Sequence, residues 1–167
     1  MPRYRPWKTG RSGGVRTAQA SDIGDARALA AGLWSFVELR RKEVDPARLG
    51  RVILCDTRQR DRIGVVASWL ASRPEVEVLA YDHHPPDSDD VPHGGGLVDP
   101  AAGATATLMV EEFDRRGLGV DPALATMLLL GIYEDTGAMT YATTGPRDLR
   151  AAATLLERGA DLAAVRR

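Results

Sequence analysis

The chain has 167 residues, enough for one domain that buries a sizeable hydrophobic core. Its 44% hydrophobic and 27% charged residues are ordinary proportions for a soluble globular protein. The formal net charge of −1 argues against nonspecific binding to duplex DNA, which depends on dense cationic surfaces, but leaves room for a short nucleotide held by metal ions.

The first 20 residues are rich in Arg, Gly, Ser and Pro and show no apolar period, so they predict a flexible segment. This basic N-terminus is not followed by an apolar run and is not a secretory signal. Residues 22–42 carry apolar side chains at helical spacing and predict an amphipathic helix. No run of 18 apolar residues is present anywhere, so no transmembrane helix is expected.

Two apolar runs after the turn at Pro46 predict strands. Residues 51–55 and 76–81 are continuous enough for buried parallel strands, and residues 61–72 between them predict a helix. Cys55 lies in the first run, and we interpret it as a buried, inert thiol. As the single cysteine it forms no intramolecular disulfide, which fits a reducing cytoplasm.

Residues 85–96 combine prolines, aspartates and three consecutive glycines and predict a loop. The run Gly94-Gly95-Gly96 favours a flexible hinge over a phosphate-binding loop, because no lysine follows it. His93 is interpreted as a solvated loop histidine, with an approach to the site as the alternative. Leu97-Val98 is a candidate short strand.

Three helices are predicted in the last third of the chain, over residues 104–116, 122–133 and 146–158. The second is strongly apolar and ends just before Asp135. Pro146 and Gly159 mark the start and the stop of the third. The alternation of strands and helices indicates an α/β fold, with a small parallel sheet flanked by helices.

Polar clusters follow three of these apolar segments. Asp56 ends the first strand, Asp82-His83-His84 ends the second, and Asp135 follows the apolar helix. Because the carboxyl ends of parallel strands share one edge, the clusters can converge there. Imidazole and carboxylate together suit Mn²⁺, Zn²⁺ or Fe²⁺ better than Ca²⁺. Taken alone, the second cluster could also be a solvated turn.

The order of Asp56, Asp82-His83-His84 and Asp135-Thr136-Gly137 resembles the DHH phosphoesterase family. This family includes manganese pyrophosphatases, single-strand exonucleases, oligoribonucleases and cyclic-dinucleotide phosphodiesterases. The residues around these motifs are similar to the N-terminal DHH domain of bacterial multidomain tRNA nucleotidyltransferase/poly(A)-polymerase-like proteins. The same holds for Thr143-Thr144 and the segment from Asp148. The resemblance covers about residues 33–165 and implies a partial DHH domain within residues 21–167.

The resemblance implies a site with two divalent metals, usually Mn²⁺ and alternatively Mg²⁺. Asp56 would bridge the metals, and His83 and Asp135 would each bind one of them. His84 would act in catalysis by contacting the scissile phosphate, and Asp82 would orient its histidine neighbours. The implied partners are phosphate-containing small molecules or short single-stranded RNA, in the cytoplasm.

The family's first motif, a histidine followed by two or three aspartates after an N-terminal strand, has no match here. The only histidines are His83, His84 and His93. Asp22 and Asp25 faintly resemble the acidic part of this motif, but an N-cap for the following helix is the better interpretation. The N-terminal strand and the C-terminal substrate subdomain also lack a counterpart, which suggests the interior of a larger protein.

Three hypotheses follow. The first is a metal-dependent phosphoesterase domain, truncated and weakly active, that acts on short RNA, nucleotides or related phosphodiesters or phosphoanhydrides. The second is a non-catalytic DHH domain that positions RNA for an attached nucleotidyltransferase. The third is a structural α/β domain with incidental acids. Loss of the N-terminal strand would also expose a sheet edge, which predicts homodimerisation or poor solubility.

Overall fold

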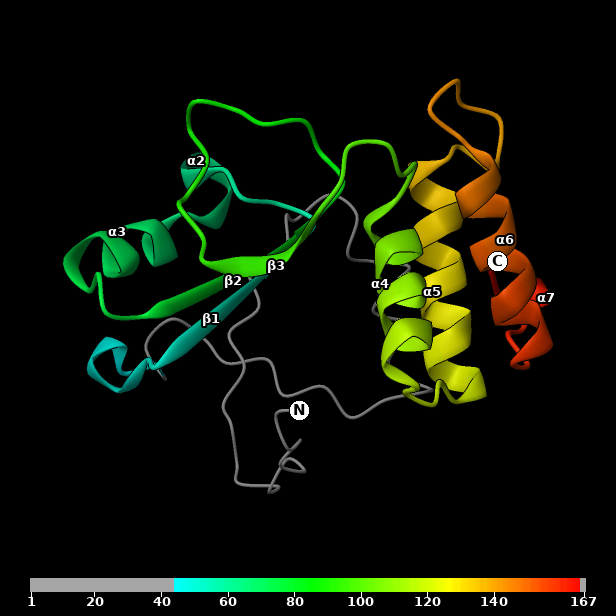
Figure 1. Ribbon diagram of the computed structural model, residues 1–167, viewed down its shortest axis with the longest axis horizontal. Helices are drawn as coiled ribbons and strands as arrows, with labels where there is room; N and C mark the ends of the chain where they lie inside the picture. Colours follow the sequence, from blue (N-terminus) through cyan, green and yellow to red (C-terminus); the bar gives the residue numbers. More distant parts are fainter. Residues whose placement is uncertain (1–43, 166–167) are drawn as a thin grey trace.

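The computed structural model describes residues 44–165 (Figure 1). The flexible segment expected over residues 1–20 and the helix expected over residues 22–42 lie outside them. The described part contains a parallel sheet with the order β1-β2-β3, made of β1 (Arg51–Cys55), β2 (Glu77–Asp82) and β3 (Gly95–Val98). The predicted parallel α/β fold is therefore confirmed.

The sheet register places the ends of β1 and β2 side by side. Cys55 is opposite Tyr81, and the backbone N–H of Asp56 donates to the carbonyl of Tyr81 at 2.9 Å. Asp82 is the last residue of β2 and is opposite Val98 of β3. The residues that follow β1 and β2 therefore leave the sheet at the same edge.

Helices lie on both sides of the sheet (Figure 1). Figure 1 shows α2 and α3 on one side and α4 to α7 on the other, with α4 nearest the strands. The helices of the described part are η2 (Pro46–Arg48, a 3-10 turn), α2 (Arg60–Ile63), α3 (Val65–Ser72), α4 (Thr105–Arg116), α5 (Pro122–Asp135), α6 (Pro146–Glu157) and α7 (Leu162–Val165). Not one of the helices in this part is long and apolar enough to cross a membrane.

Two hydrophobic clusters stabilise these layers. One joins Ile63 and Val66 of the α2–α3 pair to Leu54 and Val78 of the strands. The other holds α4 to α7 together, and its fully buried members include Leu155. The carboxyl edge of the sheet contacts the start of α4 through Thr105.

The helix predicted over residues 61–72 is in fact two helices separated at Gly64. This glycine has φ +57° and ψ −125°, a conformation that residues with a Cβ rarely adopt. A single glycine inside a helical pattern is often tolerated, so the sequence did not reveal the break.

The interpretation of Gly94-Gly95-Gly96 as a hinge is wrong, because Gly95 and Gly96 are residues of β3. Gly96 has φ +104°, and a Cβ at this position would lie 1.9 Å from the carbonyl oxygen of Ala80. Glycine here therefore allows β3 to approach the backbone of β2. His93, in the preceding loop, is exposed as predicted, with Nδ1 3.1 Å from the carbonyl oxygen of Gly95.

The burial expected for β1 is also wrong. Cys55 is exposed, and Ile53, on the same face, is 51% exposed. Only Leu54 of this strand is buried, where it packs in the cluster with Ile63. Ile53 and Cys55 lie on the face of β1 opposite Leu54, and they belong to neither hydrophobic cluster of the described residues.

Candidate metal centre

Asp56 is the residue that turns the chain away from β1. Its φ of +62° lies in the left-handed region, which aspartate tolerates better than most residues with a Cβ. The side chain is 52% exposed. Its Oδ1 accepts a hydrogen bond of 2.7 Å from the hydroxyl of Thr105 at the start of α4. Asp56 is therefore fixed by both β2 and α4.

Asp82 is 1% exposed and holds His84 through two hydrogen bonds. Its Oδ1 accepts from the backbone N–H of His84 at 3.1 Å and contacts Nδ1 of the same ring at 2.7 Å. Because the carboxylate only accepts, this contact places a hydrogen on Nδ1. The other ring nitrogen, Nε2, is then available for a ligand.

His83 presents its Nε2 to two carboxylates. Nε2 lies 3.5 Å from Oδ1 of Asp56 and 4.0 Å from Oδ2 of Asp135. On the other side of the ring, Nδ1 faces the carbonyl oxygen of Ala102 at 3.4 Å, which favours a hydrogen on Nδ1. In that tautomer a lone pair faces two carboxylates, and a cation between them would turn this repulsion into attraction.

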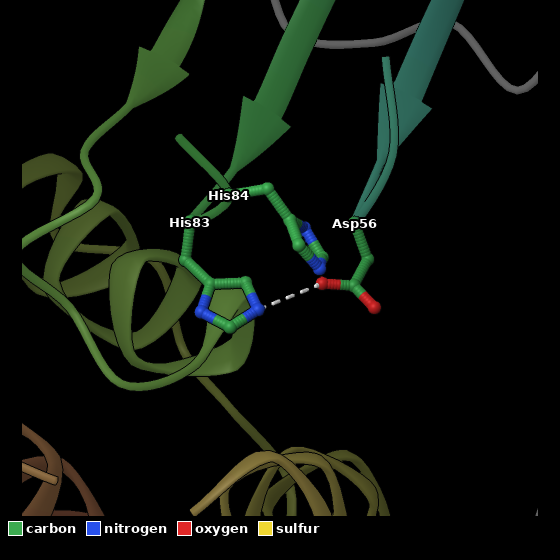
Figure 2. A group of neighbouring side chains, drawn as sticks. All are labelled: Asp56, His83 and His84. Carbon is green, nitrogen blue, oxygen red and sulfur yellow. Dashed lines mark ion pairs between the residues drawn. The ribbon is translucent and has the colours of Figure 1, made fainter. Parts of the chain in front are cut away.

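Four of the five site residues that the sequence singled out thus meet at one edge of the sheet, and the fifth, Asp82, contacts His84. Figure 2 shows the side chains of Asp56, His83 and His84 directed toward one another from the ends of β1 and β2. One ligand atom from each of these three lies within 4.8 Å of the others. The two imidazole rings pack edge to face with centroids 4.4 Å apart, and Asp135 joins the group from the last turn of α5.

Asp135 shows the electrostatic cost of this arrangement. Burial raises the pKa of its carboxyl to about 6, the charge of Asp56 adds to the increase, and His83 acts in the opposite direction. Two carboxylates and two imidazoles in close proximity fit a borderline transition-metal ion such as Mn²⁺ or Zn²⁺. The donor set of this site therefore suits the metal that the resemblance implied.

Thr105 and Arg58 are two site residues to which the sequence assigned no role. The hydroxyl of Thr105 donates to Asp56 and also accepts from the backbone N–H of His83 at 3.2 Å, so it links two of the clusters. Arg58 is 3% exposed and lies 3.3 Å from Asp82. The only sequence signal for Thr105 was its place at the start of a predicted helix. Arg58 had no signal beyond its place two residues after Asp56.

Other residues of the resemblance support the backbone. Thr136 is fully buried and its hydroxyl accepts from the backbone N–H of Met139 at 3.1 Å, which shapes the turn after Asp135. Asp148 is also fully buried and caps α6 through the backbone N–H of Gly145 at 2.7 Å. Within the described residues, these two side chains hold secondary structure in place and form no hydrogen bond with the cluster.

Known proteins are similar to this chain in sequence and in fold. No protein-family model matches the chain. The A-adding tRNA nucleotidyltransferase of Geobacter sulfurreducens is 44% identical over 124 residues, which are 74% of this chain and 14% of that protein. The bifunctional oligoribonuclease and PAP phosphatase NrnA of Thermus thermophilus is 40% identical over 88 residues, 52% of this chain and 26% of that protein.

A solved structure shares the fold. The putative family II inorganic pyrophosphatase of Methanococcus jannaschii gives a TM-score of 0.60 at 21% identity and covers 81% of this chain and 44% of that one. This similarity agrees with the parallel α/β fold. In its motifs and its relatives the chain is similar to DHH phosphoesterases, as the sequence predicted. It spans only 14% and 26% of the length of the two curated relatives.

Proposed function

We propose that this chain is a metal-dependent phosphoesterase domain that hydrolyses short single-stranded RNA, nucleotides or a related phosphodiester or phosphoanhydride. The observation that carries the proposal is the convergence of Asp56, His83 and His84 within 4.8 Å, with Asp135 4.0 Å from His83. These residues come from three separate segments, and a solvated turn would not bring them together.

Asp56, His83 and Asp135 are the residues that would hold a divalent cation, with Mn²⁺ or Mg²⁺ as candidates. When bound, such a cation stabilises charge on a phosphate and supplies an activated water. Thr105 keeps Asp56 in its orientation through the 2.7 Å hydrogen bond. The hydrogen bond between Nδ1 and Asp82 leaves Nε2 of His84 to face the phosphate. Nε2 would donate to a phosphate oxygen when the ring carries a second hydrogen, and the carboxylate of Asp82 would stabilise that charged ring.

The class of substrate rests on the relatives. One is named an oligoribonuclease and PAP phosphatase, and the other a tRNA nucleotidyltransferase, so both names refer to RNA or a nucleotide. The net charge of −1 supports a short substrate held at the site over a long one bound along a basic surface. Further domains in the parent protein would then supply the remaining contacts.

A second function is favoured by one feature of the sequence. The histidine-plus-aspartates motif has no match, because the three histidines are His83, His84 and His93. Fewer metal ligands mean weaker catalysis. The chain would then be a non-catalytic DHH domain that positions RNA for an attached nucleotidyltransferase.

Hydrolysis assays on the metal-free chain, with and without added Mn²⁺, separate the two functions. The substrates are a five-nucleotide RNA, 3′-phosphoadenosine 5′-phosphate and bis-p-nitrophenyl phosphate. Phosphoesterase action predicts slow Mn²⁺-dependent hydrolysis that is abolished in Asp56→Ala and in His84→Ala. His93→Ala, at an exposed loop histidine, is the matched control and should retain wild-type activity.

Two outcomes oppose the phosphoesterase proposal. Activity that survives in Asp56→Ala would mean that the chemistry does not use this site. Complete absence of hydrolysis, combined with retained binding of the five-nucleotide RNA, would favour the RNA-positioning function.

A further inference from the structure

Arg58 is the most deeply buried cationic side chain of the described part, and it lies directly behind the candidate site. It follows Asp56 by two residues, on the turn between β1 and α2, and is 3% exposed. A guanidinium is rarely buried unless it is fully compensated. The partners that compensate it therefore indicate what it does.

The guanidinium of Arg58 reaches four acceptors, one on the last residue of β2 and three in the segment that follows it. Nη2 donates to the carbonyl oxygens of His84 and Pro85, both at 3.1 Å, and lies 3.0 Å from Oδ2 of Asp90. Nε lies 3.3 Å from Oδ2 of Asp82, which is close enough for an ion pair but lacks hydrogen-bond geometry. All four acceptors belong to the segment that carries the histidines.

The two oxygens of Asp82 have different partners. Oδ2 faces Arg58, and Oδ1 accepts from the backbone and contacts Nδ1 of His84. The ion pair with Arg58 thus fixes the plane of the carboxylate, and the carboxylate fixes the ring. Arg58 also binds the carbonyl oxygen of His84 itself, so it restrains this residue through both its side chain and its backbone.

The loop after β2 also docks through main-chain contacts that do not involve the side chain of Arg58. The backbone N–H of Val91 donates to the carbonyl oxygen of Arg58 at 2.9 Å, and Gln59 and Asp90 form an antiparallel bridge. These contacts involve only main-chain atoms, and none of them is made by His84. The side chain of Arg58 therefore has a role beyond loop attachment, at Asp82 and His84.

We propose that Arg58 is a positioning residue for His84: its guanidinium holds the Asp82 carboxylate and the His84 carbonyl so that the imidazole keeps one tautomer and one orientation, with Nε2 toward the substrate phosphate. The kinetic part of this inference rests on the proposed function. The structural part, the tautomer of His84, does not.

The test uses the full chain and three variants. Arg58→Met removes the charge and keeps much of the apolar volume. Arg58→Lys keeps the charge, but a single ammonium cannot reach the carboxylates and both carbonyls together. Arg60→Met is the matched control. Arg60 also pairs with this loop, at 3.7 Å from Asp89, but its side chain is 45% exposed and its ion pair does not involve Asp82 or His84.

The first measurement is the tautomer of each histidine, from long-range ¹⁵N–¹H NMR spectra at alkaline pH. The wild-type chain and Arg60→Met should show His84 with a single Nδ1–H tautomer. Arg58→Met should show a mixture of both tautomers, and Arg58→Lys a smaller admixture. His93, in the exposed part of the loop, should be the same in all four proteins and serves as the internal reference.

The second measurement is Mn²⁺-dependent hydrolysis of bis-p-nitrophenyl phosphate together with Mn²⁺ affinity. Residues that orient a group from behind a site typically contribute about 10- to 100-fold to activity. We expect kcat to fall at least about 10-fold in Arg58→Met and less in Arg58→Lys, with Mn²⁺ affinity within about 3-fold of wild type. A residue that merely stabilises the fold would not lower kcat while leaving the Mn²⁺ affinity nearly unchanged.

A folded Arg58→Met or Arg58→Lys chain that retains the single wild-type tautomer of His84 would overturn the inference. If Arg58→Met does not fold, because Asp82 is left as an uncompensated buried charge, Arg58→Lys decides. If the wild-type chain hydrolyses nothing, the proposed function fails, and the tautomer measurement still decides the role of Arg58.

Discussion

At the scale of single residues, the site combines groups that repel one another without a cation. Asp56 and Asp135 approach the same nitrogen of His83, at 3.5 and 4.0 Å. In the favoured tautomer this nitrogen is an acceptor as well. Such a cluster is costly to fold unless it binds a positive ligand. The geometry therefore leads directly to a measurement of metal affinity.

We predict weak binding of Mn²⁺, mostly at one site, because Asp56, His83 and Asp135 supply only part of the ligands that two metals need. Asp135→Asn should weaken Mn²⁺ binding about 10-fold or more, since it removes a ligand charge. Glu134→Gln changes the exposed neighbour of Asp135 in the same way and should leave the affinity within about 3-fold. Titration calorimetry measures all three proteins, and two tight sites in the wild type would contradict the prediction.

The sequence identified the cluster because motif residues directly follow apolar segments, and parallel topology brings such ends together. It did not identify the supporting residues. The contacts of Arg58 with His84 and of Thr105 with Asp56 join residues 26 and 49 positions apart. These contacts form only through tertiary packing, which no local sequence pattern encodes.

At the scale of helices and strands, two aspartates cap helices in different surroundings. Asp121 is exposed and accepts from the backbone N–H of Leu124 at 2.8 Å, at the start of α5. Asp148 is fully buried near the start of α6 and accepts from the N–H groups of Gly103 and Gly145 and the hydroxyl of Thr107. It therefore joins α6 to the start of α4.

Asp148→Ala should destabilise the chain more than Asp121→Ala does. Loss of a buried acceptor leaves its donors unsatisfied, at about 1–3 kcal/mol for each group, whereas loss of an exposed N-cap costs about 1 kcal/mol. Urea unfolding followed by circular dichroism measures both variants. Equal losses would mean that water replaces the carboxylate of Asp148.

Glu112 gives α4 a pH-dependent contribution to stability. Hydrogen bonds from Arg115, at 2.7 and 2.8 Å, and then from Arg116 lower the pKa of this carboxyl to about 2, against the opposing effect of burial. A lowered pKa stabilises the fold fully above the ordinary value of 4.5, and the contribution is lost as the pH falls toward 2.

We therefore expect Glu112→Gln to cost about 1 kcal/mol at neutral pH, a modest value because Arg115 and Arg116 are 67% and 49% exposed. The difference from wild type should shrink between about pH 4 and pH 2. Urea unfolding of both proteins at neutral pH and at about pH 3 provides the check. A difference that is the same at both values would exclude the ion pairs as its source.

The bounds of helices and strands were predictable where the local sequence pattern determines them. They were missed where backbone angles or neighbouring strands determine them. The helix predicted over residues 104–116 and the strand over 51–55 match α4 and β1 closely. The break at Gly64 and the strand role of Gly96 depend on backbone angles and on the approach of β2. The exposure of Cys55 likewise depends on which strand or helix covers β1.

At the scale of the whole molecule, β1 is the strand through which we propose that two chains associate. Ile53 of β1 is 51% exposed. An exposed apolar side chain of this size can be buried by a second copy of the chain, which favours association. The described part of the chain presents a second apolar surface on α6, where Leu149 is 54% exposed, so the two sites can be compared.

We predict a homodimer that dissociates in Ile53→Lys, because a charge at this position opposes the burial of the apolar side chain between two copies. Leu149→Lys is the matched control, with the same type of change at a similar exposure, and should remain dimeric. Sedimentation velocity over a range of concentrations measures the state of all three proteins. Dissociation by Leu149→Lys alone would move the interface to α6, and a wild-type chain that is monomeric throughout would refute dimerisation through β1.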